Sequence, residues 1–240
     1  GWETMDDPAA PGNTIIFKDS HYQDVVWNTA HTNNYNASIS GGSEAANYNV
    51  SLGYVDQGGV FLGTGYQRFS ALANAGYKVT DNFRMDINTS YLWNDNKYSD
   101  DYTRDFTRST RIPSLNRLYN DDGTPNLGES SNPRNRLHQL YYQDFNNNTA
   151  RWIGRIALDW EIIKNLHYRP SASLNSTITS TMNFEKFYPQ QSRPRDKYQR
   201  MAKSSQIMTD HILQYDFSIK KHNIMALAGF NYTINESFWV

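Results

Sequence analysis

The 240-residue sequence contains no cysteine, which excludes a disulfide framework and a thiolate metal site. It has no run close to the roughly 18 consecutive apolar residues that a membrane-spanning helix needs. Its mean hydropathy is −0.76. Lysine and arginine (23) nearly balance aspartate and glutamate (24), and the resulting net charge of −1 argues against nucleic acid as the main partner.

The sequence also lacks the motifs of common catalytic and cofactor sites. It has no hydrolase nucleophile elbow, no phosphate-binding loop and no dinucleotide-binding fingerprint. The six histidines show no metal-ligand spacing. The composition of segment 120–126 favours a hairpin turn over a calcium-binding loop, because the segment lacks the full series of calcium ligands. We therefore expect no enzymatic activity and no cofactor.

Aromatic residues, by contrast, are abundant for so polar a chain, with 17 Tyr, 11 Phe and 6 Trp. A membrane β-barrel reconciles these features, because only alternate residues face lipid and aromatic residues collect at the two membrane interfaces. A soluble polar protein is the simpler alternative, but it leaves the aromatic content unexplained.

Alternation of apolar and polar residues dominates from residue 33 onward and predicts an all-β, antiparallel fold. The strand lengths suit the roughly 9–11 residues of a tilted membrane strand better than the roughly 5–6 of an average soluble strand. The eight expected strands are 33–41, 46–55, 66–79, 82–94, 149–162, 166–178, 205–219 and 223–235.

Short and long connections alternate between these strands, as periplasmic turns and extracellular loops do in outer-membrane barrels. The pattern predicts an extracellular segment at 1–32, a partial barrel at 33–240, and long extracellular loops at 95–148 and 179–204. Both ends of the strand series then lie outside. We therefore expect middle strands of a larger barrel rather than an independent eight-stranded one.

Five short segments carry a family resemblance, and the first reads DVVWNTA at residues 24–30. Residues 34–44 read NYNASISGGSE and residues 48–54 read YNVSLGY. DQGG follows at 56–59 and GYQRFS at 65–70. In order and spacing, the region 22–95 resembles the SusC/RagA family of TonB-dependent outer-membrane transporters.

The same segments contain residues that are typical of turns in any protein. Gly41 and Gly42 are expected to permit positive φ in a tight turn. Asp56, Gly58 and Gly59 are expected to form a turn at the outer end of a hairpin.

The resemblance implies a barrel of about 22 strands with a plugged lumen, to which this chain contributes roughly the second to ninth. It implies a location in the bacterial outer membrane, surrounded by lipid, as in Bacteroidota. It further implies import of oligosaccharides or peptides, with a SusD-like surface lipoprotein as partner. TonB would act through a segment absent from this chain.

The membrane interpretation assigns side chains to two faces. An arginine facing lipid costs about 2–4 kcal/mol at the midplane, so charged residues must face the lumen. They are substrate or plug contacts or, more simply, salt-bridge partners of the plug or of neighbouring strands. The expected lumen-facing residues are Arg68, Arg84, Asp86, Arg151, Arg155, Asp159 and Glu161. The expected lipid-interface aromatics are Tyr48, Tyr54, Phe83, Tyr91, Trp93, Trp152, Trp160, Tyr215 and Phe217.

Two questions stay open at the level of sequence. The loop 95–148, rich in Tyr, Asp, Arg and Asn, suits capture of sugar or peptide, packing against a partner lipoprotein, or simple solvation. A soluble β-rich glycan-binding surface domain is the alternative to the importer. The importer hypothesis fails if Phe83, Ile87, Trp152 and Trp160 pack together in one dry centre.

Overall fold

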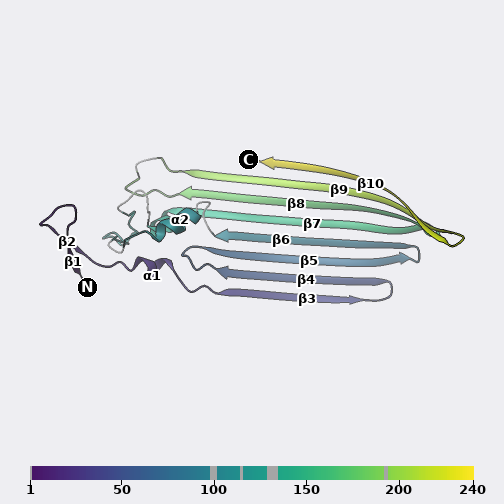
Figure 1. Cartoon of the computed structure of the whole chain (residues 1–240), viewed down its shortest axis with the longest axis horizontal. Helices are drawn as coiled ribbons and strands as arrows, with labels where there is room; N and C mark the ends of the chain where they lie inside the picture. The colour runs from purple at the N-terminus through teal and green to yellow at the C-terminus, as the bar shows by residue number, and fades with distance from the viewer. Residues whose placement is uncertain (1, 98–101, 114–115, 129–134, 192–193) are drawn as a thin grey trace.

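A computed structural model describes residues 2–97, 102–113, 116–128, 135–191 and 194–240. Its main feature is an eight-stranded antiparallel sheet in which each strand pairs with its neighbours in sequence (Figure 1). This confirms the expected all-β antiparallel fold. The strands are β3 (Thr32–Gly42), β4 (Ala46–Gly58), β5 (Gly65–Thr80), β6 (Phe83–Lys97), β7 (Gln143–Ile163), β8 (Leu166–Glu185), β9 (Lys197–Ile219) and β10 (His222–Trp239).

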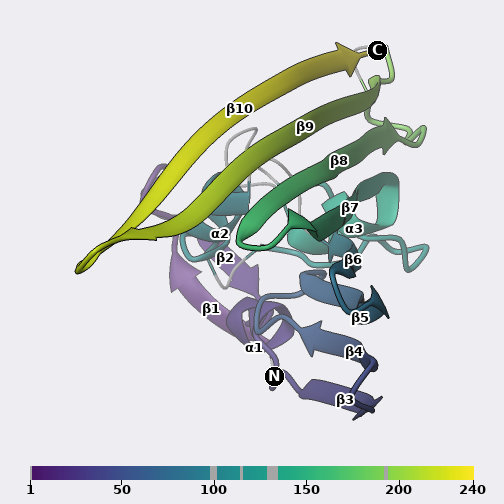
Figure 2. The ribbon, with the colours of Figure 1, turned by 90° about the vertical axis from the view of Figure 1, so that its right-hand side faces the viewer.

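The sheet is open, with β3 and β10 as its two edges. Figure 2 shows that it is curved from one edge to the other. A curved open sheet with two unpaired edges has the shape of a section cut from a barrel wall, and a closed barrel would remove both edges.

The two ends of the sheet differ in their connections. Short turns at 43–45, 81–82, 164–165 and 220–221 lie at one end. The opposite end carries the longer connections and both chain termini (Figure 1). It also carries the hairpin of β1 (Glu3–Asp6) and β2 (Thr14–Phe17) and the helices α1 (Tyr22–Val26), α2 (Tyr102–Ser109) and α3 (Arg136–Tyr142). We call this end the rim.

Several strands extend further toward the rim than the alternation predicts. β7 starts at Gln143 instead of residue 149, and β8 runs to Glu185 instead of residue 178. The ladder continues to the pair Gln143↔Glu185 because backbone groups go on pairing after side-chain alternation ends. The connections are therefore shorter than expected, at 98–142 and 186–196. Residues 98–101, 114–115 and 129–134 of the expected loop 95–148, and residues 192–193 of the expected loop 179–204, lie outside the described residues.

Buried hydrophobic side chains gather at the rim and not in the sheet. Tyr22, Val26, Phe61 and Ile112 form one cluster, with Trp27 and Leu118 packed against it. Among the described residues, no hydrophobic side chain of β3–β10 is buried. Ile87, Trp152 and Trp160 keep 36%, 49% and 43% of their surface exposed, and Phe83 is half-buried. The sheet therefore has no dry centre of its own.

The glycines of the first short turn have a different role from the expected one. Gly41 and Gly42 end β3, and neither has a positive φ. A Cβ on Gly41 would lie 2.7 Å from the Tyr48 hydroxyl oxygen, and one on Gly42 would lie 2.8 Å from the Ala46 carbonyl oxygen. Glycine is needed here for space, which corrects the expectation of positive φ.

The second glycine motif also sits differently. Asp56 and Gly58 belong to the end of β4, so the turn proper is 59–64. The Gly59 N–H donates to the Thr64 carbonyl at 3.0 Å, and Gly63 has φ of 75°. Gly59 therefore opens the turn, and Gly63 supplies the left-handed residue that glycine adopts most readily.

Candidate functional site

The strand register sorts side chains onto two faces of the sheet, since directly paired residues of an antiparallel ladder point the same way. Phe69 pairs with both Tyr54 and Trp93, and Tyr91 pairs with Trp152. We call this side the apolar face. All nine expected aromatics lie on it: Tyr48, Tyr54, Phe83, Tyr91, Trp93, Trp152, Trp160, Tyr215 and Phe217.

The opposite side, the polar face, carries a group of charged residues on β5–β8. Arg84 pairs with both Lys78 and Asp159, and Glu161 pairs with His167. All seven residues expected on one side lie here: Arg68, Arg84, Asp86, Arg151, Arg155, Asp159 and Glu161. Two sets of side chains that the sequence separates by alternation are thus also separated in space.

Near the short turns, the polar face is ion-paired. The Arg84 guanidinium donates to the Asp86 carboxylate at 2.8 Å. Asp159 contacts His167 Nδ1 at 2.8 Å and Arg169 Nε at 3.0 Å. The first pair lies within β6, and the contacts of Asp159 link β7 to β8. Salt bridges within the wall are the simpler of the two roles expected for these charges.

Toward the rim, the arginines of the polar face lack carboxylate partners. Arg68, Arg151 and Arg155 form no ion pair with any residue in the described part of the chain. Arg151 Nε donates to Asn175 Oδ1 at 3.1 Å, and Arg155 donates to the Ser171 hydroxyl at 3.4 Å. Charged residues of the polar face are therefore ion-paired near the short turns, whereas Arg68, Arg151 and Arg155 are not paired with a carboxylate in the described part of the chain.

Polar groups on the apolar face bond to one another. The Trp152 indole N–H donates to Thr89 Oγ1 at 2.8 Å. The Tyr168 hydroxyl and His211 Nδ1 lie 2.7 Å apart. Such pairs satisfy polar atoms without water, as an apolar surrounding requires.

Several residues break the simple alternation, and four of them were missed at the level of sequence as follows. Leu72, Leu92 and Ile153 lie on the polar face, and His211 lies on the apolar face. Counting every second position from Arg68, Arg84, Arg151 and Tyr215 would have found them.

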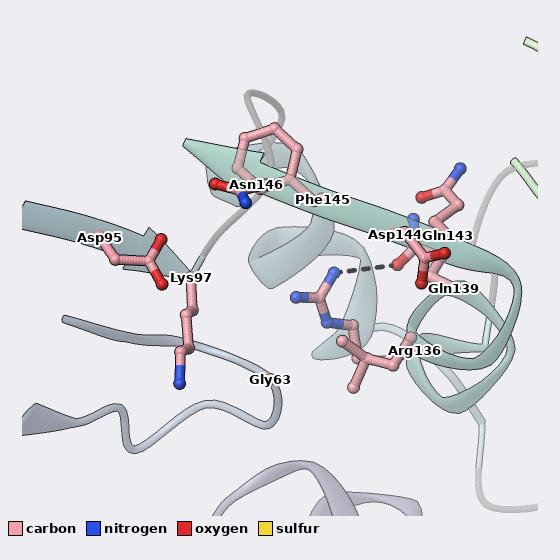
Figure 3. Close-up of a pocket in the computed structure, with 10 residues that line it drawn as sticks. Gly63, Asp95, Lys97, Arg136, Gln139, Gln143, Asp144, Phe145 and Asn146 are labelled. Atoms are coloured by element: carbon pink, nitrogen blue, oxygen red, sulfur yellow. Dashed lines mark hydrogen bonds between the residues drawn. The ribbon is translucent and has the colours of Figure 1, made fainter. Parts of the chain in front are cut away.

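A cavity of about 340 Å³ opens at the rim and is lined by Asp95, Lys97, Arg136 and Asp144, among others (Figure 3). Arg136 is buried, and its Nη1 donates to Gln139 Oε1 at 3.4 Å. Opposite charges thus face one cavity, at the end where the chain contributes helices and long connections.

Arg136 also ties the rim together. Its guanidinium carbon lies 5.1 Å from the centre of the Phe61 ring, and its Nε donates to the Leu62 carbonyl at 3.2 Å. Its backbone N–H donates to the Tyr22 hydroxyl at 3.0 Å. Around Arg136, the expected loop 95–148 is therefore packed against other rim segments.

Segment 120–126 forms the tight turn that its composition indicates. Tyr119 and Pro125 form an isolated antiparallel bridge, and Gly123 has φ of 81°. The Asp122 carboxylate accepts hydrogen bonds from Thr124 Oγ1 and the Thr124 N–H at 2.6 and 2.9 Å. The hydroxyl bond is the main reason why the pKa of Asp122 lies below its usual value.

None of the helices in the described ranges has the length and apolar composition to cross a membrane. No family model matches the chain. Two curated proteins do. The TonB-dependent receptor SusC of Bacteroides thetaiotaomicron is 27% identical over 180 residues, which cover 65% of this chain and 17% of that protein. The TonB-dependent receptor P3 of Formosa agariphila is 21% identical over 222 residues, covering 88% of this chain and 22% of that protein.

The fold matches solved structures as well. The RagAB peptide importer in its closed-closed state superposes with a TM-score of 0.74 and 21% identity, covering 92% of this chain and 27% of that chain. This chain therefore spans about a fifth of the length of its curated relatives and about a quarter of that structure.

The names of these proteins are those of receptors and importers and not of enzymes, in agreement with the expectation of no catalytic activity. Receptors of this type reside in the bacterial outer membrane, as the sequence predicts for this chain. Sequence relatives and structural neighbours together support the resemblance: the chain is similar in sequence to the SusC and P3 receptors, and its fold is that of a segment of the RagAB barrel.

Proposed function

We propose that this chain forms part of the wall of a TonB-dependent importer, with its apolar face against outer-membrane lipid and its polar face toward an aqueous lumen. The carrying observation is the one-sided grouping of nine aromatic and seven charged residues across neighbouring strands. A lipid-facing wall needs this separation, because charged side chains are costly on the lipid side.

The rim then faces the outside of the cell. Longer connections and helices lie there, as in barrels whose extracellular loops exceed their periplasmic turns. A SusD-like lipoprotein would dock on this end, and TonB would supply energy from the opposite side. The cargo would be oligosaccharide or peptide nutrients, of which the name of the RagAB peptide importer supports peptide.

The alternative, a soluble glycan-binding domain, fits these surfaces less well. Such a domain would bury one side of its sheet, yet Ile87, Trp152 and Trp160 are exposed on the apolar face. An apolar surface of this extent in water marks an interaction or aggregation site.

Single-cysteine labelling tests the proposal, and the described chain contains no cysteine to compete. Ile156→Cys and Arg155→Cys place spin labels at adjacent positions on opposite faces. In the receptor reconstituted into bilayers, we expect the label at 156 to collide mainly with oxygen and the label at 155 mainly with a water-soluble nickel chelate. Equal exposure of both labels to the nickel chelate would contradict the membrane-wall assignment.

Uptake by cells tests the transport activity separately. Cells that express the intact receptor should accumulate its labelled nutrient, and dissipating the proton gradient should abolish that accumulation. Uptake that persists without the gradient would exclude TonB as the source of energy.

A further inference from the structure

Positive charge is concentrated where β9 begins at the rim. Residues 185–203 contain six lysine and arginine residues but only two acidic ones, in a chain whose net charge is −1. Those that are described and exposed on this stretch of β9 are Lys197, Arg200 and Lys203. Neither of the two lysines forms an ion pair with any residue in the described ranges. Their charge is therefore available to a group from outside the chain.

The strand register places both lysines on the apolar face of the sheet. Lys203 pairs with Ile178 on β8 and with Phe238 on β10, and Lys197 pairs with Phe184. Ile178 and Phe238 keep 40% and 61% of their surface exposed. A lysine between exposed apolar side chains is typical of a membrane interface, where its hydrocarbon stem contacts acyl chains and its ammonium group reaches the headgroups.

The ladder row of Lys203 is also the row of the outer aromatic residues. Followed from strand to strand, it runs through Tyr54, Phe69, Trp93, Ala150, Ile178 and Lys203. On β4–β6 this row carries tyrosine, phenylalanine and tryptophan, which collect at membrane interfaces. On β9 a lysine takes the corresponding place.

Counting along β9 gives a similar height. A lipid-facing band about 25 Å tall needs about 9–11 residues of a tilted strand. Phe217 and Ile207 lie on the apolar face ten residues apart and so span such a band. Lys203 lies four residues further toward the rim, and Lys197 lies beyond it. Their ammonium groups are therefore at and above the level of the outer-leaflet headgroups.

The charge on this face changes sign across the sheet. One row nearer the rim, the apolar face carries Asp56 on β4 and Asp95 on β6, but Met201 on β9. Glu236 of β10 lies one row from Lys203, and no ion pair joins the two. At this height an anionic group is therefore repelled on β4–β6 and attracted to β9.

We propose that the outer end of β8–β10 binds the phosphate group of an outer-leaflet lipid headgroup. Lys203 would contact the phosphate as a charged donor, and Lys197 would add attraction from above. Ile178 and Phe238 would contact the acyl chains of the same lipid. Charge complementarity and continuity with the lipid-facing band favour a lipid over an acidic protein. The inference rests on the proposed function, since these lysines meet lipid only if the apolar face does.

Native mass spectrometry of the intact receptor in detergent tests the inference. The probes are lipid A with its phosphates and the same lipid A after their removal. We expect the phosphorylated lipid to bind at least about tenfold more tightly, because each lysine near an anionic lipid contributes about fivefold. Lys203→Gln should lower that preference about fivefold, and the double substitution Lys197→Gln with Lys203→Gln should remove it.

Arg200→Gln provides the matched control, since Arg200 is exposed on the same strand and pairs with Thr181 on the polar face. It should keep the preference, and so should Lys203→Arg, which retains the charge. The ratio of the two affinities guards against misfolding, because loss of folded protein affects both lipids equally. Equal binding of the two lipids, or an unchanged ratio in the double variant, would overturn the inference.

The two proposals fail in distinguishable ways. If the label at 156 meets lipid while the double variant leaves the ratio unchanged, only the lipid-binding assignment is wrong. If the label at 156 meets the nickel chelate in the bilayer, the membrane-wall assignment itself is wrong.

Discussion

A β-carbon placed on Gly42 would lie 2.8 Å from the carbonyl oxygen of Ala46, across the first short turn of the sheet. The opposing atom belongs to the backbone of a paired strand and has little room to move. At Gly41, the opposing atoms belong to the side chain of Tyr48, which is 46% exposed and can turn aside.

The two glycines should therefore differ in their tolerance of alanine. We expect Gly42→Ala to lower the free energy of unfolding by about 1–3 kcal/mol, as overpacking does, and Gly41→Ala to lower it less. Urea unfolding of the receptor in bilayers measures both. An equal effect of the two substitutions would show that the short distance from Gly42 to the Ala46 carbonyl does not set the cost of adding a side chain.

Lys220 adopts φ of 56° in the last short turn, a conformation that disfavours residues with a β-carbon. Lys220→Gly should therefore raise the free energy of unfolding by up to about 1 kcal/mol. Lys221→Gly is the control: Lys221 has no positive φ, so glycine there should bring no gain. Destabilisation by both substitutions would contradict a strained Lys220.

Arg136 should stabilise the rim but not the sheet. Arg136→Lys keeps the charge but loses the planar fork over Phe61 and the Nε bond to Leu62. We expect amide hydrogen exchange to rise at least about tenfold in α1 and the turn 59–64, with β7 and β8 unchanged. Arg117→Lys, at an exposed position, should change neither region.

The strength of the hydrogen bond between Trp152 and Thr89 depends on whether lipid or water surrounds the apolar face. In hydrocarbon the indole N–H has no water to replace a lost partner, so the two side chains should be coupled. A double-mutant cycle of Trp152→Phe and Thr89→Val should give a coupling of about 0.5–1.5 kcal/mol in bilayers. A coupling near zero would mean that water reaches this face.

The turn at 120–126 should respond to acid through Asp122. Its pKa in the folded state is lowered, so its hydrogen bonds stabilise the turn at pH values above the unfolded pKa of about 3.9. That contribution is lost as pH falls through the folded pKa. Thr124→Val should raise the pKa of Asp122, as measured by the pH dependence of its carboxyl carbon shift. An unchanged pKa would exclude the Thr124 hydroxyl as the cause.

Much of the wall was predictable from sequence. Alternation separated Trp152 and Trp160 from Arg151 and Arg155, and the register places them on opposite faces. The pairings β3–β4, β5–β6, β7–β8 and β9–β10 followed from the short turns, because consecutive strands joined by two or three residues pair with each other. The pairings β4–β5, β6–β7 and β8–β9 span longer connections and did not follow from turn length. The strand ends at the rim were harder to predict from sequence, because backbone pairing continues where side chains no longer alternate.

Sequence alone determined the two faces and the four strand pairs joined by short turns, because alternation and short turns are local properties of the chain. Tertiary structure decided which charges meet: Asp159 pairs with Arg169 across a turn, while Arg151 has no described carboxylate within reach. It also decided that Arg136 lies over Phe61, 75 positions earlier in the chain. Such contacts depend on the path of the whole chain at the rim, and no short-range pattern in the sequence encodes that path.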